Sequence, residues 1–385
     1  MKKLAIITTH PIQYYAPLFR ILSQSSKLCI KVFYTWNISA TGTQDPGFGK
    51  LIEWDIPLLD GYNYTFVTNI SNKPGSHHFR GIVNPTLNDE IKDWGANALL
   101  VFGWNYQSHL QAIRYFKGLI PIYFRGDSHL LDEKFGIKTF ARRMFLRWVY
   151  SHIDIAFYVG QNNKQYYLAH GLSDDQLKYT PHAIDNKRFS NTSFEYSNQA
   201  LIWRKSLGIE LSDTVFLFAG KLEPKKNPNL LLESFIGLKE QNIHLIFVGN
   251  GILERSLKKQ SKPYNNIHFL DFQNQTIMPI VYRLGNVFVL PSQGPGETWG
   301  LAVNEAMACS IPVLISDKVG CAVDLVKPGC NGYVFKSGNH NDLMNKMRTF
   351  IHSKDKLNEM SKHSAQIIKH WSYENISNNI VQQLG

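Results

Sequence analysis

The chain alternates short, nearly continuous apolar runs with longer stretches in which apolar residues recur every three or four positions. Such runs are typical of strands buried on both faces of a parallel sheet, whereas the longer pattern is typical of amphipathic helices. In the first half, strands are predicted at Leu4–Thr8, Cys29–Tyr34, Ala98–Phe102, Ile120–Phe124 and Asp154–Val159. In the second half, they are predicted at Val215–Gly220, His244–Gly249, Ile267–Leu270, Val287–Leu290, Val313–Ile315 and Gly332–Phe335.

Helical patterns separate these strands, and the less regular piece Thr35–Pro74 is predicted to form loops with extra strands. The alternation predicts two doubly wound α/β domains rather than one. The first covers residues 1–189, a polar linker covers 190–198 and the second domain covers 199–370. The predicted helices are Tyr15–Ser23, Pro85–Trp94, Ser108–Lys117, Gly136–His152, Asn163–His170, Pro228–Lys239, Leu253–Gln260 and Ile277–Leu284.

The helical stretch Lys134–His152 combines five cations with several large apolar residues, among them Phe140, Met144, Phe145 and Trp148. A helix of this kind can lie on an anionic membrane. It can also pack its apolar face on the sheet and expose its charges, and we favour that interpretation.

The stretch from Pro291 to Gly320 carries the chemistry that is easiest to interpret. A Gly- and Pro-rich loop leads from a buried strand through Glu297, Thr298, Trp299 and Gly300 into an Ala-rich helix that begins near Leu301. The start of such a helix presents unpaired backbone N–H groups and the positive end of the helix dipole, which favour a phosphate. Glu297 and Glu305 would be repelled by a diphosphate, so they suit the hydroxyl groups of sugars on either side of it.

Glu297 to Glu305, followed by Ala306-Met307-Ala308 and Pro312-Val313, resembles the E-x7-E signature of the retaining glycosyltransferases called family 4. The resemblance implies the GT-B fold, in which two Rossmann-like domains face each other across a cleft. It also implies a last helix, within residues 371–385, that crosses back to the first domain. In this scheme Glu305 holds the ribose and Glu297 the transferred sugar, while the residues from Thr298 to Leu301 meet the donor.

Two further loops follow predicted strands and resemble donor-binding loops of the family. In Gly220–Asn227, Lys221 and Lys226 stand where relatives carry an Arg and a Lys that hold the donor diphosphate. Lys221 is a departure, because a lysine lacks the bidentate fork of arginine, and a solvated lysine cluster is the alternative. Gly249 and Gly251 resemble the G-x-G loop beside the nucleotide or form a plain tight turn, and Leu270–Phe272 corresponds to the segment that meets the base.

On the acceptor side, residues at predicted strand ends are the candidates, because ligands bind there in such folds. His10 contacts acceptor or donor, or else caps the helix that Pro11 begins. Asn105 follows another strand. Asp127 could accept a hydroxyl proton or orient the acceptor, and Arg125 could bind an anionic group, or the two could simply pair with each other.

Bulk composition restricts the possible partners and the compartment. The net charge is +11 over 385 residues and is more basic in the first half, which suits a phospholipid surface or a lipid diphosphate. No nucleic-acid-binding motif accompanies this charge. Four cysteines without a C-x-x-C pair predict a reducing cytoplasm, with contact at the inner face of the membrane as a further possibility.

The resemblance therefore implies a retaining transfer of a hexose-type sugar from a UDP- or GDP-sugar to a glycan or lipid-linked acceptor, with bacterial surface polysaccharide or glycan synthesis as the expected setting. No strict Asp-x-Asp occurs, so we expect lysines and helix amides to neutralise the diphosphate without a metal or another cofactor. Two alternatives stay open: a nucleotide-sugar epimerase of the same fold, and a non-catalytic glycan-binding protein.

Overall fold

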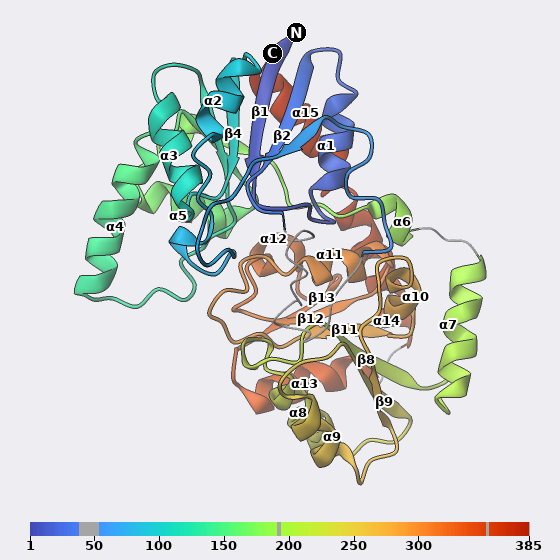
Figure 1. Cartoon of the computed structure of the whole chain (residues 1–385). Helices are drawn as coiled ribbons and strands as arrows, with labels where there is room; N and C mark the ends of the chain where they lie inside the picture. The colour runs from blue at the N-terminus through green and yellow to red at the C-terminus, as the bar shows by residue number, and fades with distance from the viewer. Residues whose placement is uncertain (38–53, 191–193, 352–353, 385) are drawn as a thin grey trace. The chain divides into compact units, whose positions relative to one another are not determined.

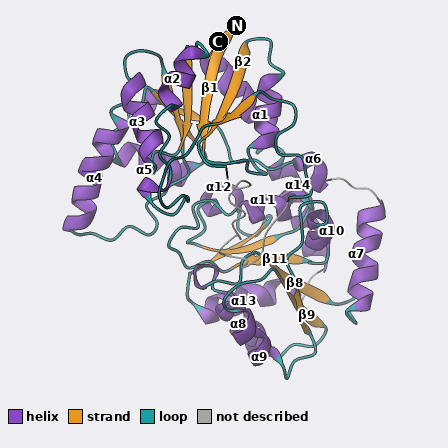
Figure 2. Ribbon diagram, in the orientation of Figure 1, coloured by secondary structure: helices purple, strands orange, loops and turns teal. Residues whose placement is uncertain are grey.

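The computed structural model of the protein describes residues 1–37, 54–190, 194–351 and 354–384, which form two compact units (Figure 1). Within these described residues, the first unit comprises 1–37, 57–182 and 373–384, and the second comprises 54–56 and 183–372. Each unit contains one parallel β-sheet with helices packed around it (Figure 2). The predicted class, two doubly wound α/β domains, is confirmed.

The first sheet has the strand order β3-β2-β1-β4-β5-β6-β7, and all neighbouring strands are parallel. Its strands are β1 Lys2–Thr8, β2 Leu28–Tyr34, β3 Tyr64–Phe66, β4 Ala98–Phe102, β5 Ile122–Arg125, β6 Ile155–Tyr158 and β7 Leu177–Tyr179. The prediction missed β7, because a three-residue strand with one buried side chain leaves no apolar run. The helices of this unit are α1 Ala16–Ser23, α2 Leu87–Asp93, α3 Gln107–Phe116, α4 Ile137–Tyr150, α5 Gln161–Ala169 and α15 Tyr373–Leu384, with short 3₁₀ turns η2 Phe79–Gly81 and η3 Asp174–Gln176.

The second sheet has the order β10-β9-β8-β11-β12-β13 and is also parallel throughout. Its strands are β8 Thr214–Ala219, β9 Ile243–Val248, β10 Ile267–Leu270, β11 Val287–Leu290, β12 Val313–Ser316 and β13 Gly332–Phe335. The helices are α6 Asn186–Ser190, α7 Phe194–Ser206, α8 Pro228–Leu238, α9 Glu254–Ser261, α10 Met278–Arg283, α11 Leu301–Ala308, α12 Ala322–Leu325, α13 His340–Ile351 and α14 Lys354–Ile368, with the 3₁₀ turn η4 Pro224–Lys226.

The central strands form the core of each unit. Leu4–Ile7 of β1 and Val215–Phe218 of β8 are fully buried, since helices cover both faces of each sheet. Burying a large aliphatic or aromatic side chain stabilises a fold by about 1.5–3 kcal/mol. Because both faces of these strands are buried, their sequences are continuously apolar, and the sequence alone predicts them as strands.

The boundary between the units lies earlier than the sequence suggested. Packing divides the chain between His182 and Ala183 rather than at residue 189, because α6 packs against α10 and α11 of the second unit. The predicted linker 190–198 is also wrong in part, because α7 begins at Phe194. Residues 191–193 lie outside the described residues.

Helix α15 belongs to the first unit although it follows the second unit in the sequence. It packs against α1. The Lys2 ammonium donates a hydrogen bond to the Leu384 carbonyl at 2.9 Å, and the Tyr123 hydroxyl donates one to the Gln383 carbonyl at 3.0 Å. Asn379 donates in turn to the carbonyl of Tyr179 in β7 at 2.8 Å.

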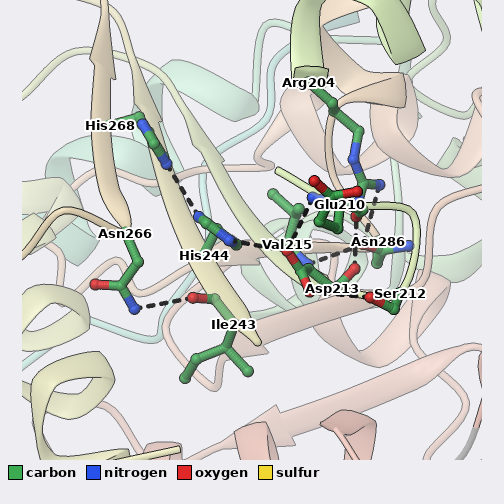
Figure 3. A network of polar contacts seen from close by, with 10 residues as sticks. All are labelled: Arg204, Glu210, Ser212, Asp213, Val215, Ile243, His244, Asn266, His268 and Asn286. Carbon is green, nitrogen blue, oxygen red and sulfur yellow. Dashed lines mark hydrogen bonds and ion pairs between the residues drawn. The ribbon is translucent and has the colours of Figure 1, made fainter. Parts of the chain in front are cut away.

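A polar network links the amino ends of β8, β9 and β10 (Figure 3). His244 Nε2 lies 3.1 Å from the Asp213 carboxylate, and His244 Nδ1 lies 3.1 Å from His268 Nε2. The buried Arg204 guanidinium donates to the Asp213 carbonyl at 2.9 Å. Burial lowers the pKa of both histidines, that of His268 to about 4.

Helix α4 packs one face on its unit and exposes most of its cations, as the favoured interpretation expects. The packed residues are Leu146, Val149 and Tyr150, however, whereas Phe140 and Met144 are exposed. The helix therefore carries a second apolar stripe near its carboxyl end, and that stripe contacts the core. No helix among the described residues is long and apolar enough to cross a membrane.

Candidate functional site

The strand order of the second sheet reverses direction between β8 and β11, which makes this the topological switch point of the unit. In doubly wound sheets, ligands bind beyond the carboxyl ends of the strands at such a point, because the flanking loops diverge there. The loop Gly220–Asn227 follows β8, and the loop Pro291–Gly300 follows β11. Both are loops in which the sequence predicted donor-binding residues.

Two hydrogen bonds to backbone carbonyls hold these two loops together. The Gln293 N–H donates to the Lys225 carbonyl at 2.9 Å, and the Gln293 side-chain amide donates to the Pro224 carbonyl at 2.8 Å. The β8 loop then turns through Asn227 in the left-handed region, at φ 50°, and Pro228 begins α8. Lys226 is thereby placed beside the loop that follows β11.

A buried ion pair connects the two loops. The Lys226 ammonium lies 2.5 Å from the Glu297 carboxylate, and the Ser292 hydroxyl donates to the same oxygen at 2.9 Å. Burial by itself raises the pKa of Glu297, but the charge and hydrogen bond of Lys226 and the Ser292 hydroxyl outweigh it, so the net pKa is lowered. The pair therefore keeps a charged carboxylate and an ammonium together within the fold.

Helix α11 begins directly after this pair, at a glycine that the packing requires. Gly300 has φ +93°, and a Cβ there would lie 2.8 Å from a Val319 methyl group. The N–H groups of Leu301 and Ala302 in the first turn have no partner within the helix, and Gly300 has no side chain to cap them. The Gly320 and Cys321 N–H groups bind the carbonyls of Glu297 and Trp299 and fix the approach to the helix.

The other donor-side residues of this segment have distinct surroundings. Trp299 is buried and its indole N–H donates to the Asn304 side chain at 2.8 Å, so it supports the loop from inside. Thr298 is half-buried. Glu305 is buried on α11, and the Tyr282 hydroxyl of α10 donates to its carboxylate at 2.7 Å. Sequence reasoning does not identify Tyr282, because a tyrosine on a neighbouring helix belongs to no motif.

Gly249 and Gly251 allow close backbone approach. A Cβ on Gly249, where φ is +121°, would lie 2.3 Å from the Gly220 carbonyl oxygen. A Cβ on Gly251 would lie 2.5 Å from the Leu222 carbonyl oxygen. The G-x-G turn therefore packs directly on the Lys221-containing loop, which a plain tight turn does not require.

Asn250, between these glycines, positions the segment after β10. It is buried, its side-chain carbonyl accepts from the Phe272 N–H at 3.0 Å, and its amide donates to the Asp271 carboxylate at 3.0 Å. Leu270 lies at the end of β10, next to this anchored segment. Sequence reasoning missed Asn250, although its place within G-x-G after a strand could have identified it.

In the first unit, the switch point lies between β1 and β4, and two predicted residues follow these strands. His10 Nδ1 hydrogen-bonds the Thr9 hydroxyl at 2.9 Å, and its ring contacts Trp36 edge-on, with the ring centres 5.5 Å apart. Asn105 is exposed after β4. His109 is buried with its pKa lowered to about 4 by that burial, and it binds the Gly103 carbonyl at 2.9 Å beneath this loop.

Arg125 and Asp127 do not form the simple pair that was one alternative. Arg125 is buried and donates to the carbonyls of Thr180 at 2.8 Å and Pro181 at 3.0 Å, a structural role that leaves its terminal nitrogens occupied. Asp127 is about 40% exposed and lies 3.6 Å from His182 Nε2. Burial lowers the pKa of His182, while the nearby Asp127 carboxylate opposes that shift.

These observations define two doubly wound α/β units, the second of which brings the loops after β8 and β11 together at its switch point. The crystal structure of Anabaena HepE in complex with UDP and glucose matches it with a TM-score of 0.71 at 16% identity, covering 100% of this chain and 99% of that one. At this identity the likeness establishes the fold. Residues 200–367, which include both glutamates and both lysines, match the family model "Glycosyl transferases group 1".

Curated relatives match part of the chain. A D-inositol 3-phosphate glycosyltransferase of Gordonia bronchialis is 27% identical over 186 residues, 44% of this chain and 40% of its own length. A UDP-Gal:alpha-D-GlcNAc-diphosphoundecaprenol alpha-1,3-galactosyltransferase of Escherichia coli is 27% identical over 195 residues, 49% of this chain and 48% of its own. The chain thus spans less than half the length of each of these relatives.

Proposed function

We propose that the protein is a retaining glycosyltransferase of family 4 that transfers a hexose-type sugar from a nucleoside diphosphate sugar to an acceptor hydroxyl. The observation that carries the proposal is the buried pair of Lys226 and Glu297 at the start of α11. It places a cation, a carboxylate and outward-pointing amides beside one another at the switch point of the second sheet. The cation and the amides suit a diphosphate, and the carboxylate suits the hydroxyl groups of an attached sugar.

The roles follow from the chemistry of each group. The departing diphosphate develops negative charge, and preorganised cations and N–H groups stabilise such charge most effectively in a site shielded from water. Lys226, Lys221 and the amides of Leu301 and Ala302 are assigned to this task. Glu297 accepts hydrogen bonds from the transferred sugar, and Glu305 from the ribose.

The ion pair also gives a physical account of donor binding. When a diphosphate arrives, the Lys226 ammonium can turn to it, and Glu297 then exchanges an ammonium donor for sugar hydroxyl donors. Each buried charge keeps a polar partner throughout, which avoids the large cost of an isolated buried charge.

The donor is proposed to be a UDP-sugar, because the matching HepE structure contains UDP and glucose. The acceptor is proposed to be a glycan or lipid-linked saccharide in surface polysaccharide synthesis, since the Escherichia coli relative is named for a diphosphoundecaprenol-linked acceptor. We place the reaction in the cytoplasm, because a reducing compartment suits four unpaired cysteines. His10, Asn105 and Asp127 are the proposed acceptor-side residues.

Titration calorimetry with UDP and GDP tests donor binding, and release of UDP from UDP-sugars with saccharide acceptors tests transfer. We expect UDP to bind, and Lys226→Ala or Glu305→Ala to lower turnover roughly tenfold or more. Lys259→Ala on the exposed face of α9 is the matched control and should leave turnover unchanged.

Three results would overturn the proposal or redirect it. Failure of the wild type to bind either nucleotide favours a glycan-binding protein. Conversion of the donor sugar without an acceptor favours an epimerase. Near-normal turnover of both the Lys226 and Glu305 variants excludes this site as the catalytic one.

A further inference from the structure

A pocket of about 470 Å³ lies in the loop that follows β3 in the first unit. Lys73, His78 and Arg80 line this basic pocket, and no acidic residue occurs from 61 to 88. Neither the Lys73 ammonium nor the Arg80 guanidinium forms an ion pair with another described residue. Two cations without a carboxylate partner, next to a histidine, favour an anionic ligand such as a phosphate or a carboxylate.

Hydrogen bonds within this loop fix the shape of the basic pocket. The Ser71 hydroxyl donates to the Arg80 carbonyl at 2.6 Å, and the Gly75 N–H donates to the Gly81 carbonyl at 3.1 Å. Gly81 allows this close approach, because a Cβ there would lie 1.9 Å from the Gly75 carbonyl oxygen. The backbone that carries the cations is therefore preorganised, which reduces the entropic cost of binding a ligand.

A second pocket of about 470 Å³ adjoins the first, since Val83 lines both. It is lined mainly by α2 and α3, which pack against each other in the first unit (Figure 1). Asn88, Gln107 and Gln111 line this amide pocket, and Tyr115 adds a hydroxyl group. A carboxamide both donates and accepts hydrogen bonds, as a sugar hydroxyl does. The amide pocket therefore suits an uncharged, hydroxyl-rich group.

One side chain of the amide pocket lacks a hydrogen-bond partner. The Asn88 side-chain carbonyl oxygen is buried, and no described residue donates a hydrogen bond to it. A buried polar atom in this state is unfavourable, and most such atoms in folded proteins are paired. A ligand hydroxyl in the pocket would satisfy this oxygen once the carboxamide rotates toward the ligand.

We propose that the two pockets together bind an anionic saccharide, with its phosphate or carboxylate in the basic pocket and its hydroxyl groups in the amide pocket. The pockets adjoin the loop after β4, because the Tyr106 hydroxyl donates to the Ser76 carbonyl at 3.2 Å. Asn105, which is proposed to meet the acceptor, precedes this tyrosine. Identifying the saccharide with the acceptor rests on the proposed function, whereas the binding itself does not.

Saturation-transfer NMR on the full chain, with excess UDP present, tests the proposal with a matched panel of hexoses. Glucose, galactose and mannose are the neutral probes, and their 6-phosphates and uronic acids are the anionic probes. We expect at least one anionic sugar to bind roughly tenfold or more tightly than the neutral hexose of the same configuration. The tighter of its phosphate and carboxylate forms identifies the anionic group. Inorganic phosphate should compete roughly tenfold or more weakly than this sugar, because it leaves the amide pocket empty.

Lys73→Ala/Arg80→Ala should lower the affinity for the anionic sugar roughly tenfold or more, because it removes both cations of the basic pocket. The matched control is Lys27→Ala/Arg142→Ala, which removes one lysine and one arginine from other exposed positions of the first unit. It should bind the sugar as the wild type does. Unchanged circular dichroism spectra would show that both variants are folded.

Asn88→Ala/Gln111→Ala tests the amide pocket. It should weaken binding of the anionic sugar roughly fivefold and leave competition by inorganic phosphate unchanged. The proposal is overturned if no anionic sugar binds, if neutral hexoses or inorganic phosphate bind as tightly, or if the variants of either pocket bind as the wild type does. A wild type that binds UDP but no anionic sugar refutes this inference alone. A wild type that binds an anionic sugar but no nucleotide refutes the proposed function and leaves this binding site standing.

Discussion

Lys226 and Glu297 form a buried ion pair, in which each charge is the partner of the other. Their side chains are only 16% and 8% exposed, and they lie 2.5 Å apart. Removing one member of such a pair leaves the other charge buried without a partner. Removing both charges together leaves no buried charge that lacks a partner. The pair therefore contributes to stability as well as to the proposed chemistry.

We predict that Lys226→Met destabilises the protein by about 3 kcal/mol, which corresponds to a loss of roughly 6 °C or more in Tm. The double variant Lys226→Met/Glu297→Gln should recover most of this loss. Scanning calorimetry measures both, with exposed Lys259→Met as the control. Additive effects of the two single substitutions would contradict the coupling.

The pH dependence of this pair has a definite sign. The folded pKa of Glu297 is lowered, while an unfolded glutamate titrates near about 4.3. Its contribution is therefore fully present above that value and is lost as the pH falls through the folded pKa. The Tm of the Glu297→Gln variant should therefore fall less steeply than that of the wild type as the pH drops below about 4.3.

At the scale of elements, the donor-side loops are fitted to each other by backbone contact. The turn after β9 lies directly on the loop after β8, and Gly249 is the point of closest approach. A side chain there has to displace the backbone that carries Lys221, so the glycine acts on the geometry of a neighbouring loop.

We predict that Gly249→Ala weakens UDP binding at least tenfold and lowers Tm, because a Cβ would lie 2.3 Å from the Gly220 carbonyl oxygen. Gly338→Ala is the control: Gly338 also has positive φ, at +74°, but nothing lies within 4 Å of a Cβ there. Both variants carry backbone strain, and only the first carries the clash. Equal UDP affinities in calorimetry would show that the close approach does not matter for binding.

The Asp213–His244–His268 network makes the amino ends of β8, β9 and β10 sensitive to acid (Figure 3). Burial and the neighbouring His244 lower the folded pKa of His268 to about 4, whereas an unfolded histidine titrates near about 6.5. As the pH falls between these values, the unfolded chain takes up protons first, so stability is full above about pH 6.5 and declines toward pH 4.

We predict that Tm falls less steeply between pH 6.5 and 4 in the His268→Gln variant than in the wild type. The substitution removes one titrating group from the polar network that contains His244, Asp213 and Arg204. His363→Gln, at an exposed histidine of α14, is the control in calorimetry over the same pH range. An unchanged slope in the His268 variant would show that the network does not titrate as described.

At the scale of the whole molecule, both sheets were largely predictable because their central strands are continuous apolar runs. The donor loops were predictable because they follow those strands within a motif. Tyr282 and Asn250 were not identified, since they act through side-chain contacts that only the folded chain creates. The packing of one face of α4 was predicted, but not the residues that form this face, because a sequence pattern shows that a stripe is apolar but not which neighbour covers it.

Helix α15 offers a prediction about the first unit. Ile380 is fully buried in it, and removing such a side chain costs about 2–5 kcal/mol. We predict that Ile380→Ala lowers the Tm of the first unit and speeds hydrogen exchange in β1 and β2 but not in β8. Gln382→Ala, at an exposed position of the same helix, is the control. Equal acceleration in β8 would show that α15 does not stabilise the first unit selectively.

The return of α15 also has a consequence for how the protein is made. The ribosome completes residues 183–372 before it reaches the helix that finishes the first unit. At about 5–20 residues per second, the earlier strands wait roughly 10–40 s for their last partner. The second unit can therefore reach its native state during translation, before α15 is available to pack against α1.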